Sequence, residues 1–180
     1  MRNPIAATLL TFWSTQVALA QEPDDLSQLL AELAAPDTEN WQSVEERIVD
    51  LWSRSGSRSM DLLLERGQDA LEAEDYTAAL EHFTALTDHA PDFAEGWNMR
   101  ATTFYLMDRF ELSVADISRT LVLNPDHFGA LYGLGVIMEQ LDDEAAALKA
   151  YRAAQALHPH RENTAEAVKR LSEAVDGVDL

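Results

Sequence analysis

The stretch between residues 124 and 135, NPDHFGALYGLG, holds the side chains that look most capable of chemistry. Asp126 and His127 are adjacent, and a carboxylate beside an imidazole is the kind of pair that transfers protons or binds a metal ion. The glycines of the stretch are the residue type that lets a backbone wrap a phosphate group. The stretch is therefore either part of an active site or a piece of scaffold, and the surrounding sequence decides between the two.

A second candidate site is His158-Pro159-His160, with Glu162 close behind. Metal ligands converge when they lie four residues apart on a helix, and two histidines separated by a proline do not. We therefore interpret this stretch as a polar turn. The chain contains no G-x-S-x-G, H-E-x-x-H or Walker motif, and no two carboxylates stand out as an acid and base. The sequence predicts no catalytic residue, no metal site and no cofactor.

The composition limits the class of partner. The formal charge is −19, from 13 basic and 32 acidic residues among 180, and the charges form no basic stripe. Such a surface repels phosphate backbones and anionic headgroups, so we expect no nucleic acid and instead a basic or neutral partner. The chain has no cysteine, which excludes disulfides and thiolate sites. Abundant alanine, leucine and glutamate favour a helical domain.

The first twenty residues have the pattern of a signal peptide. Arg2 supplies a positive charge, an apolar run extends from Ile5 to about Phe12, and the small-x-small motif ALA ends at Ala20. The run is too short to span a membrane. We expect cleavage after Ala20 and a periplasmic protein without a membrane span. The alternative is a cytosolic protein whose first helix is apolar.

Three prolines, at positions 91, 125 and 159, are 34 residues apart and reveal an internal repeat. Each unit is predicted to form two helices, because proline ends one helix and begins the next. Asp92 and Asp126 follow their prolines, where a carboxylate can cap a helix. His127 shares its column with Phe93 and Arg161, so the repeat asks for no chemistry there. The columns that agree hold Leu63, Trp97 and Leu131; Gly67, Ala101 and Gly135; Ala79, Ser113 and Ala147; Phe83, Ile117 and Tyr151.

These columns resemble the tetratricopeptide repeat family, whose motif reads W-x2-L-G-x2-Y, A-x3-F and P. The resemblance covers Met60 to about Arg161 and implies an all-α fold, a right-handed superhelical array of antiparallel helix hairpins. We predict three repeats, at 60–93, 94–127 and 128–161. A helical hairpin at 21–59 precedes them, and a capping helix with a tail at 162–180 follows. The positions expected to hold the repeat together are Gly67, Ala79, Pro91, Trp97, Ala101, Pro125, Gly135, Ala147 and Pro159.

Three further expectations concern packing. Small residues such as Gly135 allow two helices to cross closely. Arg100 and Asp116, on the two helices of one hairpin, are predicted to form a partly buried ion pair. Residues 24–59 are expected to pack on the first repeat as a divergent hairpin, the alternative being a separate arm that binds a partner.

The resemblance implies that the first helix of each repeat lines a concave face. The expected partner-binding residues are Leu64, Gln68, Leu71, Asn98, Thr102, Tyr105, Tyr132, Val136 and Glu139, with Tyr132 the best single candidate. The places where some family members hold a carboxylate with cations contain Leu64, Gln68, Met99, Gly129 and Gly133, so that clamp is missing.

These features predict a non-catalytic periplasmic scaffold that binds a peptide or helix of another protein, for example in cell-envelope assembly. Apolar anchors and basic flanks would suit the surface. One alternative is self-association to a homo-oligomer, with the groove filled by residues 24–59. Another is a ligand-binding protein or enzyme that uses the groove.

Overall fold

The computed structural model describes residues 25–175 and residue 177, so the predicted signal peptide at 1–20 lies outside the described residues. Within the described part the chain is all-α, as predicted, and contains no β-strand. Its helices are α1 (Leu26–Ala34), α2 (Trp41–Trp52), α3 (Arg58–Glu72), α4 (Tyr76–His89), α5 (Ala94–Leu106), α6 (Phe110–Leu123), α7 (Phe128–Gln140), α8 (Glu144–Leu157) and α9 (Glu162–Val175).

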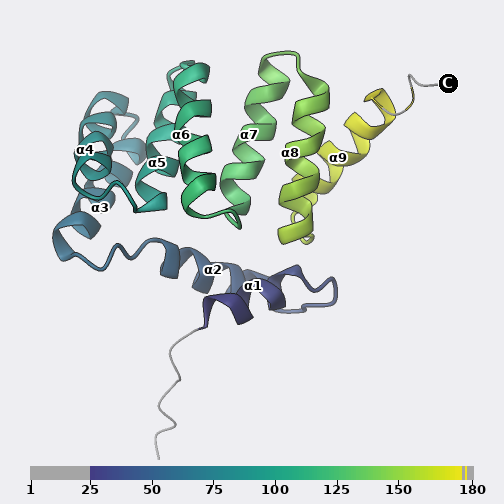
Figure 1. Cartoon of the computed structure of the whole chain (residues 1–180), viewed down its shortest axis with the longest axis horizontal. Helices are drawn as coiled ribbons and strands as arrows, with labels where there is room; N and C mark the ends of the chain where they lie inside the picture. Colours follow the sequence, from purple (N-terminus) through teal and green to yellow (C-terminus); the bar gives the residue numbers. More distant parts are fainter. Residues whose placement is uncertain (1–24, 176, 178–180) are drawn as a thin grey trace, which may run out of the picture.

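The helices from α3 to α8 form three antiparallel hairpins that stack side by side (Figure 1). In the first and third hairpins a glycine faces a large aromatic ring. A Cβ added to Gly67 would lie 2.3 Å from the Phe83 ring, and one added to Gly135 would lie 2.6 Å from the Tyr151 ring. No real Cβ tolerates such a distance, so the prediction that these positions must be small is confirmed. Helix α9 continues the array by packing Ala167 and Leu171 against α8.

The predicted ion pair joins the two helices of the second hairpin. Arg100 on α5 donates to both carboxylate oxygens of Asp116 on α6, from Nε at 2.7 Å and from Nη2 at 2.9 Å. Its Nη1 donates to the Thr87 hydroxyl of α4 at 2.8 Å, which extends the contact to the previous hairpin. The two side chains are 15% and 8% exposed. The ion pair is therefore confirmed, and it is buried enough for its partners to depend on each other.

The capping prediction is wrong at the inter-repeat turns. The N-cap residues of α5 and α7 are Phe93 and His127, one position later than the predicted Asp92 and Asp126. His127 supplies the cap of α7, because its Nδ1 accepts the backbone N–H of Ala130 at 3.1 Å. The Pro-Asp pairs lie in the turns before these caps, where the chain has not yet entered the helix.

The expected position of the N-terminal hairpin is also wrong. Helices α1 and α2, which we call the arm (residues 25–52), lie across the ends of the repeat helices (Figure 1). Their apolar face, which includes Leu33 and Ile48, packs against Phe128 and Leu157 of the third repeat and not against the first. Aromatic contacts account for this position of the arm. Trp52 and Trp41, at the two ends of α2, contact histidines in the turns before α7 and after α8.

Candidate functional site

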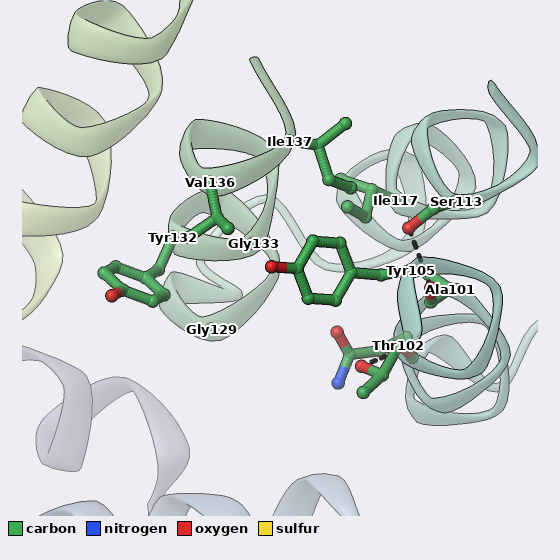
Figure 2. A pocket seen from close by; sticks show the side chains of 11 residues that line it. Ala101, Thr102, Tyr105, Ser113, Ile117, Gly129, Tyr132, Gly133, Val136 and Ile137 are labelled. Atoms are coloured by element: carbon green, nitrogen blue, oxygen red, sulfur yellow. Dashed lines mark hydrogen bonds between the residues drawn. The ribbon is translucent and has the colours of Figure 1, made fainter. Parts of the chain in front are cut away.

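A cavity of about 230 Å³ opens between α5, α6 and α7 (Figure 2). Two neighbouring hairpins form it, since α5 and α6 belong to the second repeat and α7 to the third. Its lining is largely apolar, with hydroxyl and amide groups at a few points and no charged side chain among the described residues that line it. The lining residues are Asn98, Ala101, Thr102, Tyr105, Ser113, Ile117, Gly129, Tyr132, Gly133, Val136 and Ile137.

Five of the nine predicted partner-binding residues line this cavity: Asn98, Thr102, Tyr105, Tyr132 and Val136. Their spacing of three or four residues on α5 and α7 places them on the facing sides of two helices. That they contact a partner remains a prediction.

The two tyrosines of the cavity differ in their surroundings. The Tyr105 ring reaches from α5 toward α7 (Figure 2). It packs beside the Phe110 ring, with the ring centroids 5.9 Å apart. The Tyr132 ring lies 5.4 Å from that of Tyr151 on α8. Tyr105 therefore spans the opening more directly than Tyr132 does. The sequence alone favours Tyr132 as the best single candidate for partner contact.

The other four predicted residues lie elsewhere. Leu64 on α3 is only 3% exposed, and its side chain packs in the core of the first repeat. The prediction that it contacts a partner is therefore wrong. Gln68 and Leu71 do not line the cavity, and Leu71 packs against the core of the first repeat. Glu139 accepts the Tyr151 hydroxyl at 2.8 Å and pairs with Arg170 at 2.7 Å. The hydrogen bond from Arg170 helps hold the pKa of Glu139 below its usual value, so this carboxylate links α7 to α8 and α9.

Two glycines, Gly129 and Gly133, line the cavity from α7, and packing does not require either of them. A Cβ added to Gly133 would meet only Ile117, at 3.8 Å, and one added to Gly129 would meet only the His127 ring, at 3.4 Å or more. Glycine inside a helix costs about 1 kcal/mol relative to alanine. These glycines therefore weaken α7 and leave its backbone open to the cavity, in contrast to Gly135, whose place is dictated by the Tyr151 ring.

The histidines have structural roles that the repeat pattern did not indicate. His127 is buried, and its Nε2 lies 2.9 Å from Glu95 Oε2. Because Nδ1 accepts from Ala130, the proton is on Nε2 and is donated to Glu95. His158 and His160 lie in the turn between α8 and α9, as interpreted, but the turn is not solvated throughout, since the His158 ring is buried against the arm. The sequence signal that could have indicated these contacts is the pair of tryptophans, Trp41 and Trp52, on one amphipathic helix. Among the described residues no group could hold a metal ion.

Comparison with known proteins supports the same architecture. The model of the tetratricopeptide repeat family matches residues 64–113 and 98–162. A TPR repeat-containing protein of Rhizobium etli is 32% identical over 153 residues, covering 84% of this chain and 75% of the relative. The SGT1 homolog of Bos taurus is 33% identical over 109 residues, 61% of this chain, and the match spans 32% of that longer protein.

Among solved structures, the first TPR domain of Spaghetti (RPAP3) bound to the HSP90 peptide SRMEEVD superposes with a TM-score of 0.63. It is 21% identical, and the match covers 67% of this chain and 95% of that domain, which establishes the shared fold.

The chain belongs to the tetratricopeptide repeat family. It is a repeat scaffold of the class that binds other proteins through the surface that stacked hairpins create. No described helix combines the length and the apolar character that crossing a membrane would need.

Proposed function

We propose that this protein is an exported, non-catalytic scaffold that binds a short segment of another protein in the groove between α5, α6 and α7. The observation that carries the proposal is the convergence of Asn98, Thr102 and Tyr105 on α5 with Tyr132 and Val136 on α7 around one open cavity. The bare backbone at Gly129 and Gly133 gives a bound segment room to lie close to α7.

The chemistry of the cavity suggests what kind of segment fits. An apolar side chain suits the floor formed by Ala101, Ile117 and Ile137, while the amide of Asn98 and the hydroxyl of Thr102 can contact polar backbone groups. No lining side chain could neutralise a carboxylate, and the whole chain carries a formal charge of −19. We therefore propose a segment with apolar anchors and basic flanks. The acidic SRMEEVD sequence in the complex of the related domain would fit poorly.

The proposed location is the periplasm, with cell-envelope assembly as a setting. The pattern of residues 1–20 supports export, because a positive residue, a short apolar run and a small-x-small motif follow in that order. Self-association with the arm filling its own groove is not favoured, because the arm packs on Phe128 and Leu157 and contributes no residue to the cavity lining.

A peptide-display selection tests the proposal. We expect the purified chain to select peptides with an apolar residue flanked by lysine or arginine over peptides of the same length with acidic flanks. Tyr105→Ala should weaken the affinity for a selected peptide at least tenfold, about 1.4 kcal/mol. Leu112→Ala removes a 41% exposed side chain from α6 outside the cavity and is the matched control. Selection of acidic peptides, or equal losses in the two variants, would show that the proposal is wrong.

A further inference from the structure

The arm is held on the repeats by aromatic contacts with three histidines. The Trp52 ring stacks on that of His127 with centroids 4.6 Å apart. The Trp41 ring stacks on His160 at 5.8 Å and meets the edge of His158 at 5.4 Å. These contacts join residues that lie far apart in the sequence, and histidine is the side-chain type used most often as a pH-dependent switch in proteins.

His158 is the most enclosed of the three. Its side chain is 1% exposed, with the Phe128 ring 5.1 Å away on one side and Trp41 on another. Nε2 lies 3.0 Å from Glu45 Oε2 on the arm. Nδ1 is buried and has no hydrogen-bond partner among the described residues.

This geometry fits one protonation state. In the neutral ring with its proton on Nε2, the bond to Glu45 is made and Nδ1 is an unused acceptor. A second proton would place an N–H donor at Nδ1, which is buried and has no hydrogen-bond acceptor within reach in the described part of the chain. A buried donor without an acceptor destabilises the docked state. Docking of the arm therefore favours the neutral form of the His158 ring.

We propose that His158 is a proton-operated latch: the arm is docked on the third repeat while this ring is neutral, and it is released when the ring takes up a second proton. The inference concerns the arm alone and does not depend on what the groove binds.

The charges around His158 act in both directions. Burial is the largest influence and lowers the pKa of His158, and Arg161 and His160 lower it further, whereas Glu45 on α2 raises it; the net pKa is lowered. Burial would raise the pKa of Glu45, but hydrogen bonds from His158 and Arg161 outweigh it and hold that pKa below its usual value. Glu45 therefore stays ionised when His158 is neutral, and Arg161 keeps it paired.

The sign of the pH dependence follows from linkage. The pKa of His158 is lower in the docked arm than the ordinary value of 6.5, so the released state binds the proton better. The contribution of the neutral ring to docking is therefore fully present above pH 6.5 and is lost progressively as the pH falls below it. Uptake of one proton changes the docking equilibrium by at most about tenfold per pH unit.

The other two histidines contribute differently. A proton on Nδ1 of His127 would displace the Ala130 N–H that caps α7, although Glu95 faces its Nε2 in either state. His160 donates Nε2–H to the Ala35 carbonyl, a bond that both protonation states make. His158 is thus the ring whose protonation conflicts most directly with arm docking.

The absence of native cysteine allows the arm to be followed with paired spin labels. Labels at Gln42→Cys on α2 and Lys149→Cys on α8, both exposed positions, report the distance from the arm to the array. We expect one narrow distance distribution at pH 7.5 and, at pH 5.5, an additional population with longer distances. A reference pair at Glu111→Cys and Lys149→Cys, within the array, should not change.

Two variants make the test specific. His158→Gln keeps an N–H donor toward Glu45 but does not titrate, so its arm should remain docked at pH 5.5. Glu45→Gln removes the charge that favours protonation of the docked ring and so lowers the pKa of that ring further. The loss of docking between pH 6.5 and 5.5 should therefore be larger than in the unmodified chain. His89→Gln changes an exposed histidine at the end of α4 and should leave the transition unaltered. An arm distance that does not change between pH 7.5 and 5.5, or a His158→Gln variant that responds like the unmodified chain, would overturn the proposal.

Discussion

Arg100 and Asp116 form a two-pronged ion pair across the second hairpin, with both oxygens of the carboxylate occupied by the guanidinium group. The same guanidinium lies 4.7 Å from the centroid of the Trp97 ring. One side chain thereby connects α4, α5 and α6, and its removal tests how strongly the stacking depends on buried charge.

We predict that Arg100→Met lowers the free energy of unfolding by about 3 kcal/mol, because it leaves Asp116 buried without its partner. Urea denaturation followed by circular dichroism measures the loss. The double variant Arg100→Met with Asp116→Leu should recover part of it, since no lone charge remains. A single variant as stable as the unmodified chain would show that the pair contributes nothing.

Replacing Gly135 and Gly133, both on α7, with alanine should change the stability of the fold in opposite directions. Gly135→Ala places a methyl group 2.6 Å from the Tyr151 ring and should destabilise the fold by about 1–3 kcal/mol. Gly133→Ala meets only Ile117, at 3.8 Å, and should raise stability by about 1 kcal/mol through helix propensity. Thermal unfolding of the two variants side by side checks the contrast. Equal effects would mean that the Tyr151 ring moves aside and that the spacing is not required.

The cap of α7 gives a third prediction. His127→Ala removes the acceptor for the Ala130 N–H and should cost about 1 kcal/mol for the cap, in addition to the lost stacking with Trp52. His127→Asn retains a side-chain acceptor and should be more stable than the alanine variant. Chemical denaturation of both variants tests this, and an asparagine variant no better than alanine would remove the capping role.

Much of the repeat array could be predicted because its signals are periodic. The prolines set the period, and the small and large columns, Gly67 with Phe83 and Gly135 with Tyr151, correspond to direct contacts. Part of the groove lining could also be predicted from the sequence, because helical spacing places Asn98 and Tyr132 on the facing sides of α5 and α7. The same spacing failed for Leu64, which is buried with the core residues of α4.

The arm could not be placed from the sequence. Its position depends on contacts such as Trp52 with His127 and Glu45 with His158, which join distant segments and follow no period. The caps were misjudged for a local reason. A carboxylate after a proline resembles an N-cap, but the turn continues one residue further, to Phe93 and His127.

The proposed export makes a fourth prediction. In a bacterial host, the full-length chain should appear in the periplasmic fraction with its N-terminus at Gln21, because cleavage is expected after Ala20. Mass spectrometry of the fractionated protein measures this, and a chain that begins at Gln21 after a new initiator methionine is the control that should stay in the cytosol. Full-length protein with an intact Met1 in the cytosol would contradict the proposal.

The most direct test of the central claim, that the groove between α5, α6 and α7 binds a peptide, is a titration of Gly133→Leu with a selected peptide. Leucine favours the helix and its Cβ has room, so the variant should fold at least as stably as the unmodified chain while its side chain occupies the cavity. The account predicts an affinity at least tenfold weaker, with Leu112→Ala unaffected. An unchanged affinity in a folded Gly133→Leu protein would contradict it.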